Sequence, residues 1–161
     1  MLSEISLNDK LPRFNLEATM LNKCSDADLL GSWSVLFLYP KDNTSGCTKE
    51  TKEFNERHSD FEALGVRIFG LSKDTISSHI SFSKKLNLQF PLLSDPQTQL
   101  IQKLNAWKEK SMYGKKYMGT ERSTFLIDKK LSIKHIWRKV KVEGHVDQVF
   151  NKYKELNEGL G

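Results

Sequence analysis

The sequence predicts an α/β fold in which a central mixed sheet is flanked by helices. Residues 33–38 form a nearly continuous apolar run, which is typical of a strand buried on both faces. Cys47, Phe54 and Phe61 then recur every seven residues, which is typical of the core-facing side of a helix. A second apolar run follows at 66–71. Strand, helix and strand in this order predict a right-handed βαβ unit with parallel strands.

Weaker local signals place the remaining elements. We predict an extended segment at 11–16, a capped turn of helix at 25–31, helices at 77–86, 97–104 and about 145–156, an extended piece at 90–93, and a hairpin of 122–127 with 131–137. The last residues, 157–161, are expected to fray. This order matches a thioredoxin-like fold with an N-terminal extension, although order alone leaves other α/β folds open.

Length and composition predict one ordinary domain. A chain of 161 residues with 38% hydrophobic residues can build one core, so we expect a single domain over 1–161. No apolar run is long enough for a membrane span, and Glu4, Asp9 and Lys10 occupy the region where a secretory signal needs an apolar stretch. We therefore expect a soluble, cytoplasmic protein without a membrane partner.

The positive charge does not predict a nucleic-acid partner. The net charge of +5 is spread along the chain, and its densest group lies at 129–141. There the basic residues alternate with apolar ones, which is typical of strands with one solvated face. No nucleic-acid-binding motif accompanies them.

The cysteine and histidine counts argue against a metal or cofactor site. Cys24 and Cys47 form no CxxC pair, and the four histidines are dispersed. This pattern disfavours a disulfide scaffold, a zinc site and a thioredoxin-type dithiol. We expect neither a metal nor a cofactor.

Cys47 is the candidate nucleophile, because it lies where the buried strand gives way to a helix. Thr44 or Ser45 can cap that helix, and Glu50 suits its first turn. A sulfur there lies near unpaired backbone N–H groups and the positive end of the helix dipole, which favour the thiolate. The alternative is a buried structural cysteine, since free cysteine is among the most buried residue types.

The motif Pro40-x-x-x-Thr44-x-x-Cys47 resembles that of the peroxiredoxins. The wider sequence is similar to the peroxiredoxin Q group, also called bacterioferritin comigratory proteins. The resemblance runs from about Leu11 to the final helix. It is carried by the motif and by phrases at 36–42, 107–119, 122–128 and 144–146.

The resemblance implies a thioredoxin-like fold and a thiol-dependent peroxidase. Cys47 would attack the O–O bond of hydrogen peroxide or an organic hydroperoxide and become a sulfenic acid. A thiol reductant such as thioredoxin, glutaredoxin or glutathione would restore it. Thr44 would offer its hydroxyl to the peroxide or thiolate, Pro40 would shield the pocket from water, and Arg122 would stabilise negative charge. Glu50 would hold Arg122 by a bidentate pair.

The chain departs from this family at the second cysteine. Many members carry a resolving cysteine five residues after the first, where this chain has Lys52, and the helix predicted at 77–86 also has none. Cys24 is the remaining candidate. We favour a one-cysteine cycle resolved by an external thiol, with an atypical two-cysteine cycle through Cys24 as the alternative.

A peroxide sensor or a chaperone-like protein on the same fold is the alternative from another functional class. The same thiolate chemistry would serve it, and repeated turnover distinguishes the enzyme. The group resemblance favours a monomer.

Overall fold

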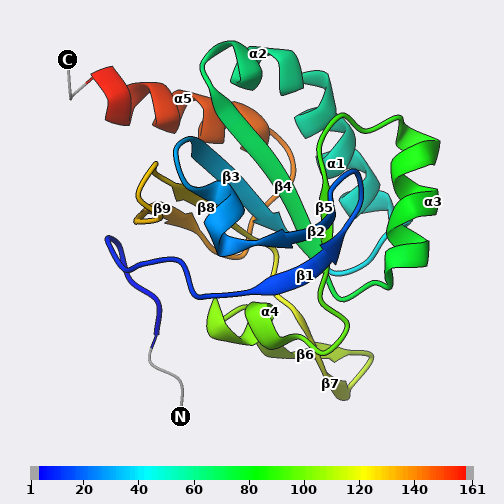
Figure 1. Ribbon diagram of the computed structural model, residues 1–161. Helices are drawn as coiled ribbons and strands as arrows, with labels where there is room; N and C mark the ends of the chain where they lie inside the picture. The colour runs from blue at the N-terminus through cyan, green and yellow to red at the C-terminus, as the bar shows by residue number, and fades with distance from the viewer. Residues whose placement is uncertain (1–3, 159–161) are drawn as a thin grey trace.

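The computed structural model describes residues 4–158 and contains a seven-stranded mixed sheet flanked by helices, as predicted (Figure 1). The strand order is β2-β1-β5-β4-β3-β8-β9, and β6 and β7 form a separate pair. The elements are β1 (Asn15–Ala18), β2 (Asn22–Ser25), the 3-10 helix η1 (Asp26–Leu29), β3 (Trp33–Leu38), α1 (Ser45–Glu56), α2 (His58–Ala63), β4 (Val66–Ser72), α3 (Ile76–Leu86), β5 (Leu92–Ser94), α4 (Gln99–Lys103), β6 (Trp107–Met112), β7 (Lys115–Thr120), β8 (Ser123–Ile127), β9 (Ile133–Trp137) and α5 (His145–Glu158).

The predicted βαβ unit forms the centre of the molecule. Strands β3 and β4 are parallel, with Trp33 opposite Val66, and all six residues of β3 are buried. The crossover is not the single helix that the sequence suggested. It divides at Arg57 (φ −96°, ψ 3°) into α1 and α2, although neither a glycine nor a proline marks the break. The division leaves Cys47 at the start of α1 and Phe61 within α2.

The core consists of two apolar layers on opposite faces of the sheet. Val35 and Phe37 belong to one cluster and Leu36 and Leu38 to the other, because successive side chains of a strand point to opposite faces. Helices α1, α2, α3 and α5 contribute to the first layer, whereas η1 and α4 contribute to the second. Cys47 lies in the first layer and Cys24 in the second.

The N-terminal extension widens the sheet beyond β5. Strand β1 is antiparallel both to β2 and to β5, so this hairpin forms one edge. The predicted hairpin of β8 and β9 forms the other end, antiparallel to β3. Its turn is held by Asp128, whose carboxylate accepts hydrogen bonds from the N–H groups of Lys130 and Ser132, each at 2.9 Å.

Hairpin β6–β7 was not predicted. Its strands are antiparallel, with Met112 opposite Lys115, so the connection is the two-residue turn Tyr113-Gly114. Both turn residues have positive φ values, 52° and 77°, as a type I′ hairpin turn requires. Figure 1 shows this hairpin next to α4, outside the main sheet.

The remaining helices differ from the predictions only at their ends. Helix α4 begins at Gln99 rather than 97, and the Asp95 carboxylate accepts from the N–H groups of Gln99 and Ile101, each at 2.9 Å. The last helix extends to Glu158, past the predicted 156, and 159–161 lie outside the described residues. Among residues 4–158, no helix combines the length and apolar character needed to cross a membrane.

Candidate active site

Cys47 lies in the first turn of α1, just past the end of β3, and is 1% exposed. The first hydrogen bond of the helix runs from the Thr48 N–H to the Thr44 carbonyl at 2.8 Å, so the Cys47 N–H precedes the bonded turns. The Thr51 hydroxyl donates to the Cys47 carbonyl at 2.7 Å and fixes the backbone of this turn. The sulfur therefore lies near the positive end of the helix dipole, as predicted.

Arg122 reaches the sulfur from the segment between β7 and β8. Its Nη2 lies 3.4 Å from Cys47 Sγ, and its Nη1 donates to Glu50 Oε1 at 2.7 Å. Gly46 leaves room for this approach, because a Cβ at that position would lie 3.3 Å from Nη2. One guanidinium thus bridges two acidic side chains from successive turns of α1.

Glu50 is fully buried, and only one of its oxygens is paired. Within residues 4–158, Oε2 has no hydrogen-bond partner, so the pair with Arg122 uses one oxygen rather than the two expected of a bidentate pair. Burial raises the pKa of Glu50 to about 7, although the charge of Arg122 acts to lower it. Burial also opposes the charge of Arg122, but Glu50 and Cys47 hold the pKa of Arg122 above its ordinary value.

Thr44 and Pro40 lie in the loop between β3 and α1. Thr44 stands at the N-cap position of α1 with extended backbone (φ −88°, ψ 155°), but its side chain does not cap the helix. Its hydroxyl instead donates to the Lys41 carbonyl at 2.8 Å, and Ser45 is already inside the helix. Pro40 is half-buried at the end of β3.

A buried polar network anchors this loop, and no motif in the sequence indicates it. Asp42 accepts a hydrogen bond from the Tyr39 hydroxyl at 2.6 Å and contacts His79 Nδ1 on α3 at 2.8 Å. The Asp42 N–H donates to the Asp74 carboxylate at 2.9 Å. The loop that leads to Cys47 is therefore tied to α3 and to the end of β4.

Within this network His79 joins α3 to the loop and to β5. Its Nδ1 faces the Asp42 carboxylate and its Nε2 faces the Leu93 carbonyl at 2.9 Å. Burial opposes the ionisation of Asp42, but the hydrogen bond and charge of His79 hold its pKa below the ordinary value. Asp42, Asp74 and His79 could together reach one metal ion, yet their ligand atoms are engaged in these hydrogen bonds.

Two further groups near Arg122 were also missed. Lys110 is half-buried on β6, and a Cβ on Gly119 would lie 3.2 Å from its Cδ. Burial, followed by the charge of Arg122, lowers the pKa of Lys110. On α5, His145 contacts the Thr124 hydroxyl through Nε2 at 2.7 Å, and burial lowers the pKa of His145 to about 4. The sequence could have pointed to both, because they fall within the phrases 107–119 and 144–146.

Cys24 does not join this site. It lies on β2, is fully buried, and belongs to the apolar layer on the opposite face of the sheet from Cys47. Burial, followed by the charge of Asp28, raises the pKa of Cys24 to about 11. Both cysteines are free.

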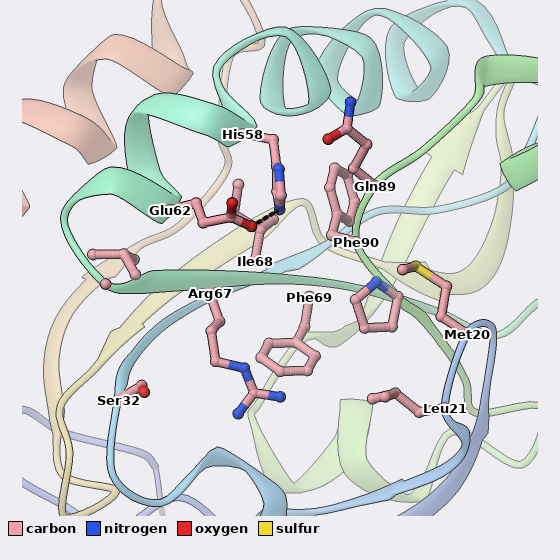
Figure 2. Close-up of a pocket in the computed structure, with 13 residues that line it drawn as sticks. Met20, Leu21, Ser32, His58, Glu62, Arg67, Ile68, Phe69, Gln89 and Phe90 are labelled. Carbon is pink, nitrogen blue, oxygen red and sulfur yellow. Dashed lines mark ion pairs between the residues drawn. The ribbon is translucent and has the colours of Figure 1, made fainter.

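A separate cavity of about 340 Å³ lies at the start of β4 (Figure 2). Figure 2 shows His58 and Glu62 on one side of the strand, with Arg67 and Phe69 on the other. His58 Nε2 lies 3.8 Å from a Glu62 oxygen. None of the predicted site residues lines this cavity, so it is distinct from the cysteine site.

Comparisons with known proteins match nearly the whole chain. Residues 7–136 fit the model of the AhpC/TSA family. A putative peroxiredoxin Bcp of Coxiella burnetii is 42% identical over 148 residues, which cover 92% of this chain and 98% of that protein. Peroxiredoxin Bcp of Bacillus subtilis is 40% identical over 154 residues, covering 96% of this chain and 98% of that protein.

Solved structures agree with this assignment. The Xylella fastidiosa PrxQ C47S mutant has a TM-score of 0.90 and 38% identity, covering 96% of this chain and 99% of its own. A Xanthomonas campestris bacterioferritin comigratory protein, described for its alkyl peroxide reduction activity, has a TM-score of 0.84 and 39% identity, covering 88% of this chain and 90% of its own. The predicted thioredoxin-like fold is thereby confirmed. The chain belongs to the AhpC/TSA family, in which it is a peroxiredoxin of the Bcp/PrxQ group and hence a peroxidase.

Proposed function

We propose that this peroxiredoxin reduces hydrogen peroxide and organic hydroperoxides through Cys47 alone and that an external thiol completes the cycle. The observation that carries the proposal is the Arg122 guanidinium 3.4 Å from the Cys47 sulfur, with the second cysteine buried in the opposite layer of the core. A fixed cation beside the sulfur stabilises the thiolate, which is the reactive form of a cysteine.

The oxidation step uses the electron pair of the thiolate. The sulfur attacks one peroxide oxygen, a bond forms between sulfur and oxygen, and the O–O bond breaks. The leaving oxygen takes a proton and departs as water or an alcohol, so Cys47 is oxidised to a sulfenic acid and the peroxide is reduced. Negative charge grows on the leaving oxygen, where Arg122 provides permanent positive charge.

Thr44 and Pro40 have supporting roles in this proposal. The Thr44 hydroxyl now bound to the Lys41 carbonyl is exposed, and it retains lone pairs to accept a hydrogen bond from the peroxide. Pro40 is half-buried beside the loop and limits the access of water to the sulfur. Both lie on the segment that the Asp42 network fixes.

An external thiol is the resolving group that best fits this chain. Lys52 stands where many members have a second cysteine, and α3 carries none. Cys24 and Cys47 lie in opposite layers of the core, with the sheet between them. Burial raises the pKa of Cys24 to about 11, which keeps it protonated. The attacking thiol forms a mixed disulfide with release of water, and a second thiol frees Cys47.

Substrate, partner and compartment follow from the same features. We infer that the chain accepts alkyl hydroperoxides, because its Xanthomonas campestris relative is described for alkyl peroxide reduction. Thioredoxin, glutaredoxin and glutathione are the candidate reductants. Two free cysteines fit a reducing compartment such as the cytoplasm. Cys47, Glu50 and Arg122 all come from one chain, which supports a monomer.

Replacing Cys24 tests the one-cysteine cycle. We expect Cys24→Ser and Cys24→Ala to retain most of the peroxidase turnover with each candidate reductant, because neither change touches Cys47. Two replacements separate the loss of a thiol from the effect of a hydroxyl in the core. If both variants fold but lose turnover, Cys24 is the resolving cysteine.

A further inference from the structure

Two buried acids contact the same guanidinium in the active site. Cys47 is 1% exposed, Glu50 is 0% exposed, and Arg122 contacts both of them. The Cys47 sulfur and the paired Glu50 oxygen lie 3.4 and 2.7 Å from the two terminal nitrogens of the same guanidinium. If both acids ionise, two negative charges share one positive charge in a place with almost no water.

One oxygen of Glu50 can carry a proton. Its Oε2 is buried and has no hydrogen-bond partner within residues 4–158, which is costly for a charged oxygen and less so for a protonated one. The same burial raises the pKa of Glu50 to about 7, although the charge of Arg122 acts to lower it.

The other charged groups around the site do not replace the missing partner. Glu53 on the same helix adds a negative charge that further disfavours ionised Glu50. Lys110 on β6 interacts with Arg122, Cys47 and Glu121 rather than with Glu50. His145 on α5 is neutral near pH 7, because burial lowers its pKa to about 4. Glu50 therefore depends on Arg122 alone for a counter-charge.

Two acids that share one counter-charge titrate as a coupled pair. A buried ion pair is tolerated when the charges balance, and a surplus buried charge is strongly disfavoured. The low-energy states of the cluster are those with one negative charge. They are a thiolate with a protonated carboxyl, or a thiol with a carboxylate.

We propose that Glu50 is the proton-holding residue of the active site, taking up a proton when Cys47 becomes a thiolate and releasing it when the sulfur is oxidised. This inference rests on the proposed peroxidase chemistry at Cys47. Sulfenic acid is neutral, so after oxidation Arg122 again lacks an anion and Glu50 ionises to supply one. Glu50 acts through Arg122 and need not touch the peroxide.

The overall step balances. A thiolate, a protonated Glu50 and a hydroperoxide give a sulfenic acid, an ionised Glu50 and an alcohol or water. One S–O bond forms, one O–O bond breaks, and the sulfur loses two electrons to the peroxide. The proton that Glu50 releases offsets the proton that the leaving oxygen takes up. Total charge is unchanged, so the site takes up no proton from the solvent.

Infrared difference spectroscopy on the peroxide-free enzyme tests whether Glu50 is protonated while Cys47 is a thiolate. At a pH where ultraviolet absorbance shows the thiolate, we expect the carbonyl band of a protonated carboxyl. The band should be lost in Glu50→Gln, strongly reduced in Cys47→Ser, and retained in Glu56→Gln, which changes an exposed glutamate of the same helix. A thiolate enzyme without this band would overturn the proposal.

Proton uptake during oxidation tests whether Glu50 releases its proton when the sulfur of Cys47 is oxidised. We mix enzyme in weak buffer with one equivalent of hydrogen peroxide and follow a pH indicator. Glu50→Gln should take up one proton more per oxidised Cys47 than the wild type, because its leaving oxygen must be protonated by solvent. Glu56→Gln should behave as the wild type. Equal uptake in Glu50→Gln and the wild type would contradict the proposal.

Failure of the peroxidase proposal would look different. In that case mass spectrometry would find Cys47 unoxidised after peroxide treatment, whatever the infrared band of the resting enzyme. A purely structural role for Glu50 would lower the rate in Glu50→Gln, yet it would change neither the carboxyl band nor the number of protons taken up.

Discussion

At the residue scale, two independent features act on the Cys47 sulfur. The helix start supplies unpaired N–H groups from the local chain, and Arg122 supplies a full charge from 75 residues away in sequence. The local feature is fixed once α1 forms. The charge depends on the tertiary fold, because β8 must pair with β3 to bring Arg122 to the sulfur.

Removing the sulfur should abolish the chemistry and leave the fold intact. We expect Cys47→Ser to lose peroxide-dependent oxidation of a thiol reductant, because the serine hydroxyl is not ionised near neutral pH. The volume change is small, so circular dichroism and the denaturation midpoint should stay close to wild type. Substantial turnover in a folded Cys47→Ser protein would refute the role of Cys47.

Removing the guanidinium should slow the reaction without stopping it. We expect Arg122→Ala to lower the rate of Cys47 oxidation by about a hundredfold, the usual effect of losing one preorganised charge-stabilising group. The thiolate absorbance near neutral pH should fall as well. Stopped-flow fluorescence or absorbance measures both. Arg13→Ala is a suitable control, because Arg13 is exposed and precedes β1 on a different part of the fold. Unchanged kinetics in Arg122→Ala would contradict the account.

The sequence predicts a cysteine at a helix start with an arginine beside it, but not the surroundings of Glu50. Cys47 and Arg122 follow from a strand-to-helix transition and from the family motif. The orphaned Oε2 of Glu50 depends on which side chains exclude water there, which is a property of packing between distant segments. For the same reason, no pattern in the sequence indicates that Cys24 is buried in the layer opposite Cys47.

At the element scale, the loop from β3 to α1 is held by a buried Asp–His pair. Asp42 and His79 are both buried, and the Tyr39 hydroxyl completes the Asp42 contacts. Removing one member of such a pair leaves an uncompensated charge, which is far more costly than losing a surface ion pair. The network therefore sets the geometry of the segment that carries Thr44.

Asp42→Asn should destabilise the protein by about 3–5 kcal/mol, the usual cost of breaking a buried ion pair. It should also slow Cys47 oxidation, because the loop loses its anchor. Denaturant unfolding measures the first effect. The control Asp60→Asn removes an exposed ion pair with Arg57 and should cost about 0–1 kcal/mol. Equal effects of the two changes would argue against a stabilising network.

Elements with strong apolar periodicity were predictable, and those governed by tertiary contacts were not. Strands β3 and β4 are apolar runs, and β8 and β9 alternate around a short polar turn, so all four were found. Strands β6 and β7 are mostly exposed on both faces, so buried and exposed residues do not alternate along them. The break at Arg57 lacks a glycine or proline and follows from the packing of α2 on β4.

At the scale of the whole molecule, two buried groups give opposite pH dependences of stability. Burial raises the pKa of Glu50 from 4.5 to about 7, so the folded state binds the extra proton and this contribution falls as pH rises through that range. Burial lowers the pKa of His145 from 6.5 to about 4, so this contribution is complete above pH 6.5 and is lost as pH falls toward 4.

Replacing His145 should therefore change the acid side of the stability curve. We expect His145→Gln to lose less stability than the wild type between pH 6.5 and about 4. In the wild type the unfolded state binds a proton on His145 more readily than the folded state does, and glutamine removes this difference. Denaturant unfolding across this range measures the slope. His135, which is only partly buried, provides the control His135→Gln with a smaller effect. Parallel curves for His145→Gln and the wild type would be inconsistent with the account.

The central claim is that Cys47 is oxidised and resolved without Cys24, and intact-protein mass spectrometry with peptide mapping tests it most directly. The protein is treated with one equivalent of peroxide, with and without a small thiol. We predict one added oxygen on Cys47 without the thiol, a mixed disulfide on Cys47 with it, and sulfinic and sulfonic acids after excess peroxide. A dominant Cys24–Cys47 cross-link within monomeric protein would contradict the claim.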